Sequence, residues 1–263
     1  MKTNRVAVLT GSTSEIGQAL SRLLLKQGFS LVNIDRNHEH AKALRNKLLG
    51  EFPAAKIENF TADLAELRQI EEVAQKIADC NYQIASLFHN AGVLLPNKQL
   101  NNAEVEMHFS VNAVAPYYLT KALIPCLQNT ENCAVIVSGS AASGMARNLK
   151  LDQLLDPKKF NAMSGAYAQS KAAVKILFSS LQAQYLSSGI SFLVVDLPPT
   201  KTKMATSEGM PSILRWLSFL FATPEKLARK LLDAAVRKKP SIPHKVDISG
   251  QNLLVELVES LKK

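Results

Sequence analysis

Long apolar runs are missing from this sequence, and so are the cysteines of a disulfide framework. No stretch of about 18 or more uncharged apolar residues occurs, which argues against a membrane-spanning helix. The first apolar stretch, RVAVLT at residues 5–10, is too short for a signal peptide and predicts a strand. Cys80, Cys126 and Cys133 have no metal-binding spacing. We therefore expect free thiols, a cytoplasmic location and no metal site.

Acidic residues are also few relative to basic ones. The chain has 22 Asp and Glu against 31 Lys and Arg, for a formal net charge of +9, and residues 200–263 alone hold 12 basic and 6 acidic residues. A basic tail can attract nucleic acid, anionic lipid or anionic substrates. The sequence shows no helix-turn-helix or zinc-finger pattern and no interleaved aromatic residues. We expect no nucleic-acid binding and interpret the tail as a solvated helical surface.

Short β-branched runs alternate with longer stretches of helical period, a pattern typical of a parallel sheet built from crossovers. The strands are nearly continuous in apolar residues, as expected when both faces of a sheet are covered. We therefore predict one α/β domain over residues 1–263, a Rossmann-like doubly wound parallel sheet flanked by helices on both faces. The strands are expected at residues 5–10, 30–35, 56–61, 84–89, 132–139 and 190–196, and the helices near 15–27, 38–50, 65–79, 101–128 and 165–188.

A glycine turn, TGSTSEIG at residues 10–17, follows the first strand. Such a turn opening into a helix exposes N–H groups and the positive end of the helix dipole to an anion. Glu15 stands where a third glycine would be expected, and its carboxylate would repel a pyrophosphate unless it points to solvent. Ser12 and Glu15 have the spacing of a capping box, which gives Glu15 a structural role. Two glycines alone are weak support for a nucleotide site.

Asp35 and Arg36 lie at the end of the second expected strand, where a dinucleotide's ribose would lie. An acid there accepts hydrogen bonds from the ribose hydroxyls and repels a 2′-phosphate. Arg36 would instead pair with such a phosphate. The sequence favours NAD over NADP on Asp35, and a solvated Asp-Arg turn remains the alternative.

Tyr167 and Lys171 begin a helical segment and, four residues apart, share one face. A nearby ammonium group stabilises a phenolate and is expected to lower the pKa of Tyr167 from its usual value of about 10. Tyr167 could then act as an acid or base for a carbonyl–alcohol pair. In isolation this pair would more often be an ordinary exposed one.

Five motifs follow one another in a fixed order: TGSTSEIG, HNAG at residues 89–92, Asn112 in SVNAVAP, Ser140 in IVSGSAA, and Tyr167 with Lys171. In this order the chain resembles the single-domain short-chain dehydrogenase/reductase family from Arg5 to about Val236. The resemblance implies an NAD(P)-dependent oxidoreductase acting on a small-molecule carbonyl or alcohol.

The resemblance also implies a role for each matching residue. Tyr167 would be the general acid or base, Lys171 would hold the nicotinamide ribose and tune Tyr167, Ser140 would bind the substrate oxygen, and Asn112 would hold a water in a proton relay. Cofactor contacts would come from the remaining matches, which are Gly11, Ser14, Ile16 and Gly17 for the pyrophosphate, Asp63 for adenine, and Asn90, Ala91 and Gly92 for the adenosine ribose.

The sequence departs from the family pattern before Tyr167 and after the sixth strand. Ser140 and Tyr167 are 27 residues apart, and the extra stretch resembles insertions of retinol-dehydrogenase-like members, which implies an apolar substrate. The usual Pro-Gly reads Pro198-Pro199, so Thr200 and Thr202 are both candidates for the threonine that touches the nicotinamide amide.

The C-terminal third carries expectations of its own. We expect a substrate lid at about 198–222, containing the apolar run MPSILRWLSFLF, and a helical tail at about 250–263. Packing within the protein or its dimer is the favoured interpretation of that apolar run, with peripheral membrane contact as the alternative.

Relatives dimerise through the helices at 101–128 and 165–188, so the resemblance implies a homo-dimer or homo-tetramer. Glu15 and the altered Pro-Gly motivate an alternative function, a non-catalytic nucleotide-binding sensor or scaffold, and the intact set of Asn112, Ser140, Tyr167 and Lys171 argues against it.

Overall fold

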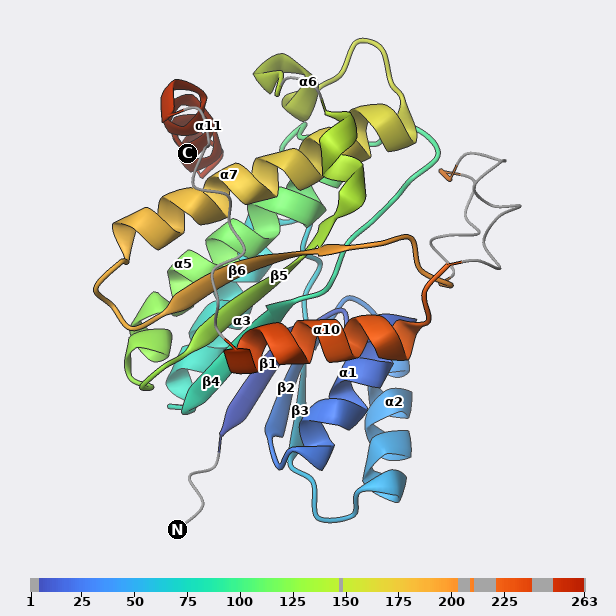
Figure 1. The fold of residues 1–263 in the computed structure, drawn as a ribbon, viewed down its shortest axis with the longest axis vertical. Helices are drawn as coiled ribbons and strands as arrows, with labels where there is room; N and C mark the ends of the chain where they lie inside the picture. The colour runs from blue at the N-terminus through green and yellow to red at the C-terminus, as the bar shows by residue number, and fades with distance from the viewer. Residues whose placement is uncertain (1–4, 147–148, 203–208, 211–220, 238–247, 263) are drawn as a thin grey trace.

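Six parallel strands form one sheet in the order β3-β2-β1-β4-β5-β6 (Figure 1). The computed structural model describes residues 5–146, 149–202, 209–210, 221–237 and 248–262. The strands are β1 (Val6–Thr10), β2 (Ser30–Asp35), β3 (Ile57–Thr61), β4 (Ile84–His89), β5 (Ala134–Ser140) and β6 (Ser191–Leu197). The order reverses between β1 and β4, so a crevice is expected where the chain leaves their carboxyl ends. This topology confirms the predicted doubly wound α/β fold.

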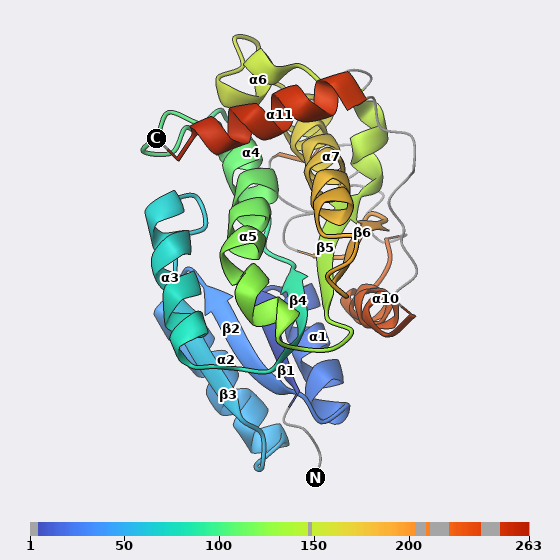
Figure 2. The same cartoon turned by 90° about the vertical axis from the view of Figure 1, so that its left-hand side faces the viewer.

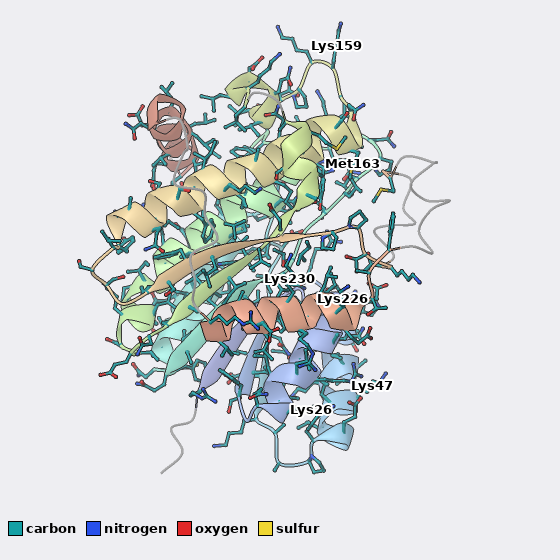
Figure 3. The ribbon with its side chains drawn as sticks, viewed as in Figure 1. Lys26, Lys47, Lys159, Met163, Lys226 and Lys230 are labelled. Atoms are coloured by element: carbon teal, nitrogen blue, oxygen red, sulfur yellow. The ribbon has the colours of Figure 1, made fainter. Side chains whose placement is uncertain are left out.

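Helices cover both faces of the sheet (Figures 1 and 2). One face carries α1 (Glu15–Lys26), α2 (His38–Glu51) and α10 (Pro224–Arg237), and the other carries α3 (Leu67–Asp79), α5 (Ala115–Gln128) and α7 (Ala168–Gln184). Lysines labelled on α1, α2 and α10 lie on the outer side of the first layer (Figure 3). Alternate strand residues therefore point into two different cores.

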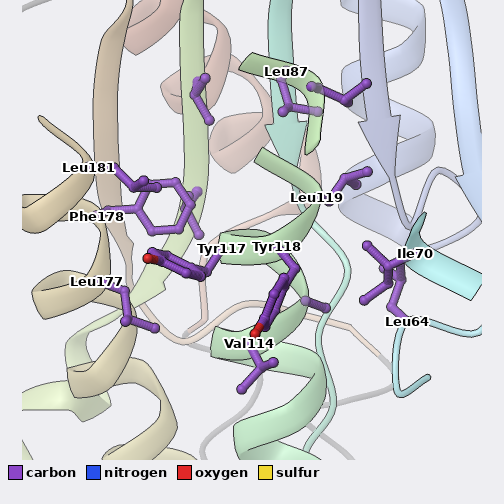
Figure 4. Packing of buried hydrophobic residues seen from close by; sticks show 14 of the residues in the cluster. Leu64, Ile70, Leu87, Val114, Tyr117, Tyr118, Leu119, Leu177, Phe178 and Leu181 are labelled. Atoms are coloured by element: carbon purple, nitrogen blue, oxygen red, sulfur yellow. The ribbon is translucent and has the colours of Figure 1, made fainter. Parts of the chain in front are cut away.

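The alternation is visible along β1 and is the reason the strands are uniformly apolar. Val6 and Val8 pack into the core beneath α3, α5 and α7, whereas Ala7 and Leu9 pack into the core beneath α1, α2 and α10. Figure 4 shows the first core at the contact of α5 with α7, where Tyr117 lies near Leu177 and Phe178. A strand buried on both faces needs an apolar side chain at every position.

The basic C-terminal segment differs in part from the expected solvated surface. Within it α10 buries one side, including Leu227 and Leu231, against the sheet core. Its basic side chains, among them Lys226 and Lys230, lie on the outside of the helix in Figure 3. The high charge of this segment conceals a regular apolar stripe, which is why the sequence predicts a solvated helical surface there and not a helix packed on the sheet. Most of the expected lid, at 203–208 and 211–220, lies outside the described residues.

The C-terminal helix α11 (Ile248–Ser260) crosses the outer side of α5 and α7 (Figure 2). Val258 is fully buried, and its carbonyl oxygen accepts a hydrogen bond of 2.8 Å from the hydroxyl of Tyr118. The carboxylate of Glu259 accepts hydrogen bonds from Tyr117, at 2.7 Å, and from Lys121. These contacts fix the helix to the start of α5.

His89, the last residue of β4, is a buried histidine whose charged form is disfavoured. Its Nε2 lies 2.7 Å from the hydroxyl oxygen of Thr120. Burial lowers the pKa of His89 from its usual 6.5 to about 3. The folded protein therefore holds this ring neutral over the whole physiological range.

We expect His89 to lower the free energy of unfolding at acidic pH. The unfolded chain takes up a proton near pH 6.5 and the folded chain only near pH 3, so the free energy of unfolding should fall by about 2 kcal/mol between pH 6.5 and about pH 5. Urea unfolding at the two pH values measures the loss. His89→Gln should lose about 2 kcal/mol less than the wild type, and the exposed control His38→Gln should match the wild type. Identical pH dependence in all three proteins would contradict the assignment.

Candidate active site

The glycine turn brings backbone segments too close for side chains. Gly11 has a φ of +69°, and a Cβ on it would lie 2.8 Å from the Cα of Ala91. A Cβ on Gly17 would lie 2.2 Å from the carbonyl oxygen of Gly11. The first turn of α1 therefore packs directly on the glycine turn, and the glycine turn packs on the chain that leaves β4.

Ser14, rather than Ser12, is the N-cap of α1. The Ser14 side chain accepts a hydrogen bond of 3.1 Å from the Gly17 N–H, as a helix N-cap does, so the expected capping box of Ser12 and Glu15 is wrong. Ser12 donates its hydroxyl proton to Asp35 instead, at 2.5 Å. Glu15 becomes the first residue of α1, where its charge favours the helix dipole.

The Asp35 carboxylate is largely occupied by hydrogen bonds within the protein. Asp35 is 4% exposed, and its carboxylate accepts two further hydrogen bonds from Thr13, at 3.2 Å from the N–H and 3.1 Å from the hydroxyl. Arg36 beside it is exposed. Asp35 thus ties the glycine turn to β2, a role that its position in the sequence does not reveal.

Asn90 ties the same turn to β4. Its side-chain amide donates hydrogen bonds to the Gly11 carbonyl at 2.8 Å and to the Ser14 hydroxyl at 3.1 Å. Its backbone N–H and that of Ala91 both donate to the hydroxyl of Thr10 at 3.1 Å. The two strand ends at the reversal point are therefore joined into one rigid edge.

Two cavities follow this edge. One, of about 360 Å³, extends along the turn and the end of β2, and the other, of about 330 Å³, lies over the end of β5. They share the lining residues Ile16, Asn90, Gly92 and Thr202, so they form one continuous groove. The first is also lined by Gly11, Ser14, Asp35, Arg36, Asp63 and Ala91.

The second cavity contains the expected chemistry. Ser140, Tyr167 and Lys171 line it together, although Ser140 comes from β5 and the other two from the helical segment of η3 (Ala162–Tyr167) and α7. Lys171 donates a hydrogen bond of 2.8 Å to the Ser138 carbonyl, and its Nζ lies 5.8 Å from the centre of the Tyr167 ring. The four-residue spacing thus brings phenol and ammonium to one place.

The titration behaviour of the pair differs from the expectation. Burial raises the pKa of Tyr167, and a hydrogen bond with Ser140 acts in the opposite direction. Burial lowers the pKa of Lys171 to about 8, while the charge of Asp196 acts to raise it. Desolvation penalises both charged forms, so the expected lowering of the Tyr167 pKa by the ammonium group is wrong, and burial determines the direction of the shift. The phenol stays protonated at neutral pH.

Asn112 lies behind this cavity in a π-helical turn, η1 (Ser110–Val114), between α4 (Met107–Phe109) and α5. Its side chain accepts a hydrogen bond of 2.8 Å from the Val93 N–H and donates one of 3.1 Å to the Ser170 hydroxyl. A Cβ on Gly92 would lie 3.1 Å from the Asn112 oxygen and 3.7 Å from the Lys171 Nζ. Asn112 and Lys171 therefore face the same small space.

The two candidate threonines differ in position. Thr200 lines only the second of the two cavities, and its hydroxyl donates to the Pro198 carbonyl at 2.9 Å. Thr202 lines both. Thr202 therefore suits a contact with a ligand at the place where the two cavities meet.

Two functional candidates escaped the sequence analysis, Glu106 and His108. Glu106 is 1% exposed and His108 is fully buried, and the His108 ring meets the Tyr167 ring edge to face with centres 6.4 Å apart. An acid two residues before a histidine, directly ahead of the Asn112 helix, was the available signal. Only the fold shows that His108 lies against Tyr167 and that Glu106 is hydrogen-bonded to His108.

Comparison with known proteins identifies the class. A family model described as short chain dehydrogenase matches residues 5–151, more than half of the chain. Polyprenol dehydrogenase of Danio rerio is 28% identical over 239 residues, which cover 88% of this chain and 74% of the relative. Human retinol dehydrogenase 13 is 26% identical over 207 residues, covering 78% and 62%.

A solved structure shows the same fold. The short-chain dehydrogenase from Sphingobium yanoikuyae in complex with NADPH superposes with a TM-score of 0.71 at 21% identity, covering 98% of this chain and 95% of that one. The chain therefore belongs to the short-chain dehydrogenase family and is an NAD(P)-dependent oxidoreductase.

Proposed function

We propose that this protein interconverts an apolar alcohol and its ketone or aldehyde, with Tyr167 as the general acid or base. One observation carries the proposal: Tyr167, Ser140 and Lys171 line one cavity that is continuous with the glycine groove. A carbonyl carbon placed between a proton donor and a hydride source is what this reaction requires.

The glycine groove fits a dinucleotide. Gly11, Ser14 and Ile16 line this groove at the N-terminus of α1, so the pyrophosphate would approach main-chain N–H groups and the positive end of the helix dipole. Asp63 and Arg36 line the far end, where adenine and its ribose would lie. When bound, the nicotinamide supplies or accepts the hydride, and every other function falls to the side chains.

The side chains divide the work on the substrate oxygen. Ser140 holds it by a hydrogen bond, and Tyr167 gives it a proton as the alkoxide develops. The raised pKa of Tyr167 keeps that proton on the phenol at neutral pH, where it can be transferred to the developing alkoxide. Lys171 and Asn112, which face one space at Gly92, are placed to replace the proton through a water.

The rest of the cavity wall favours an apolar substrate. Methionine side chains adapt to irregular apolar ligands. Figure 3 shows Met163 near the start of α7. The names of the polyprenol and retinol relatives agree with a lipid-like alcohol. The apolar lining includes Leu94, Ala142, Met145, Met163, Leu197 and Met210.

A graded series of carbonyl compounds tests this function. With reduced cofactor in excess, we expect ketones and aldehydes with long apolar chains to be reduced faster than short polar ones, with one alcohol formed for each cofactor oxidised. A protein that binds the cofactor but reduces no member of the series, and oxidises none of the matching alcohols, would instead be the sensor or scaffold.

We propose NADP rather than the NAD that Asp35 favoured in the sequence. The Asp35 carboxylate is held by Ser12 and Thr13, whereas the exposed guanidinium of Arg36 lines the groove. His40 lines the same stretch. A free guanidinium beside a committed acid suits a 2′-phosphate.

Arg36→Gln should therefore change one cofactor's affinity and not the other's. Loss of a charge-assisted hydrogen bond should raise the Kd for NADPH about tenfold and leave the Kd for NADH unchanged. Fluorescence titration measures both constants. Lys42→Gln, an exposed position on α2 that removes the same charge, is the matched control. Equal losses for both cofactors, or none for NADPH, would overturn the preference.

Assembly and location remain predictions. A homo-dimer or homo-tetramer through α5 and α7 would have to form around α11, which lies across both helices, and sedimentation of the full chain determines the state. Within the described residues no helix combines the length and apolar character needed to span a bilayer. Peripheral contact through residues 210–221 is also proposed, and co-sedimentation with anionic vesicles at low salt tests it.

A further inference from the structure

The structure contains a buried acid–histidine pair beside Tyr167 that the proposed mechanism does not use. Its acid, Glu106, caps the helix that begins at α4: one carboxylate oxygen accepts hydrogen bonds from the backbone N–H groups of His108, at 2.8 Å, and Phe109, at 3.2 Å. The other oxygen lies 2.7 Å from the His108 Nδ1. The carboxylate is thus fully engaged by the first helical turn and one ring.

The partners of His108 settle its tautomer. Its Nε2 lies 2.9 Å from the backbone nitrogen of Leu95, which is a donor, so Nε2 must be the acceptor. The ring proton then resides on Nδ1 and is donated to Glu106. Glu106 therefore fixes the orientation of the His108 ring, and the ring in turn holds the backbone N–H of Leu95, 13 residues earlier in the sequence.

The chain at Leu95 is part of the substrate wall. Leu94 lines the 330 Å³ cavity and belongs to a small apolar cluster with Tyr167, Ala142 and Met210. His108 meets the Tyr167 ring from the side, with an interplanar angle of 80°. Leu94 and His108 therefore both bear on the ring that carries the reacting hydroxyl.

The pair also reaches the inserted segment that precedes Tyr167. The Glu106 backbone N–H donates a hydrogen bond of 2.7 Å to the carbonyl of Leu155, at the end of α6 (Leu151–Leu155). The His108 ring packs against Phe160, with ring centres 6.0 Å apart. One buried pair thus contacts three elements around the cavity: the wall at 94–95, the insertion, and Tyr167.

We propose that Glu106 and His108 are positioning residues that fix the Leu94–Leu95 wall and the Tyr167 ring, and so determine how an apolar carbonyl compound is presented to the phenol. The inference rests on the proposed function for its kinetic consequence. Its structural part, that His108 holds the Leu95 N–H, stands independently of any substrate. A buried N–H without an acceptor is costly, so the wall should move when His108 is lost.

Three substitutions at His108 separate its two hydrogen bonds. Leucine removes both, glutamine keeps an acceptor within reach of Leu95, and asparagine keeps a donor toward Glu106 but is too short for Leu95. His38→Leu, an exposed position on α2, is the control for loss of a histidine. Glu106→Gln keeps the volume, but either orientation of its amide places an N–H against a donor, of His108 or of the helix backbone.

The kinetic readout is a split between substrate and cofactor. With a long-chain ketone, His108→Leu and His108→Asn should raise KM and lower kcat, each by about tenfold, because small displacements of reacting groups are costly. The Kd for NADPH should stay near the wild-type value, since the glycine turn and the chain after β2 and β3, which line most of the nucleotide groove, belong to other elements than α4. His108→Gln should restore most of kcat/KM, because glutamine keeps an acceptor for the Leu95 N–H. A role in packing alone would not predict that glutamine restores activity and asparagine does not.

The structural readout is hydrogen exchange at the Leu95 amide, which needs no activity. Protection should be lost in the leucine and asparagine variants and kept in the glutamine variant and the control. Folded variants with wild-type KM, kcat and Leu95 protection would overturn the proposal. If His108→Leu does not fold, the asparagine and Glu106→Gln variants carry the same comparison. A wild type without turnover, but with Leu95 protection dependent on His108, would refute the proposed function and leave the positioning role intact.

Discussion

Tyr167→Phe is expected to abolish turnover while leaving cofactor binding intact. The phenol is 9% exposed and lines the cavity beside Ser140, and no other described side chain there offers a proton at the same position. Loss of a general acid typically lowers kcat by about a thousandfold. The ring remains, so the packing against Leu94 and His108 and the nucleotide groove should be undisturbed. Steady-state kinetics and a fluorescence titration with NADPH measure the two quantities.

Tyr185→Phe is the matched control for that change. Tyr185 is half-buried at the opposite end of α7 and lines neither cavity of the groove. It should keep the wild-type rate. A Tyr167→Phe protein that retains more than about a tenth of the wild-type kcat would show that the proton comes from elsewhere.

Gly17→Ala is expected to have the second large effect, on cofactor binding. The added methyl group would lie 2.2 Å from the Gly11 carbonyl oxygen and 2.8 Å from the Cα of Ser12. Both are backbone atoms, so the turn and not a side chain must move. Overpacking of this kind costs about 3 kcal/mol, which corresponds to a loss of about a hundredfold in NADPH affinity if binding requires the original turn.

Gly50→Ala separates this clash from a general effect of glycine replacement. Gly50 lies in α2, and a Cβ there would meet nothing within 4 Å. Alanine in a helix is favoured over glycine, so the control should be as stable as the wild type or more stable by about 0.5 kcal/mol. Equal NADPH affinity in Gly17→Ala and the wild type would mean that the turn does not contact the cofactor.

The sheet could be predicted because its physical signal is local. Each strand is a short apolar run, and burial on both faces requires such a run, so the predicted and observed strands agree within two residues at each end. The buried face of helix α10 was missed because six of its positions carry charged residues and hide the stripe of Leu227, Leu231 and Leu232. Where local and tertiary signals agreed, the sequence was sufficient.

Residue spacing could predict only those contacts of the site that lie within one helix or turn. Tyr167 and Lys171 are four residues apart, so helical geometry alone brings them together. Ser12 and Asp35 are 23 residues apart, and the hydrogen bond between them depends on the parallel pairing of β1 with β2. The His108 contact with Leu95 depends on where the chain leaves β4. Contacts between elements follow from topology, which no short motif encodes.

The direction of pKa shifts also needed the fold. A neighbouring ammonium group lowers a phenol's pKa only if desolvation does not outweigh it, and burial cannot be judged from spacing. Both Tyr167 and Lys171 are deep in the cavity wall, so burial dominates for each.

Transfer of deuterium tests the central claim most directly. NADPH deuterated at the nicotinamide C4 is incubated with the wild-type protein and a long-chain ketone, and the alcohol is analysed by mass spectrometry. If the groove and the Tyr167 cavity form one working site, the alcohol carries the deuterium at its carbinol carbon, and Tyr167→Phe yields none above background. Bound cofactor without labelled alcohol, from any ketone of the series, would contradict the account.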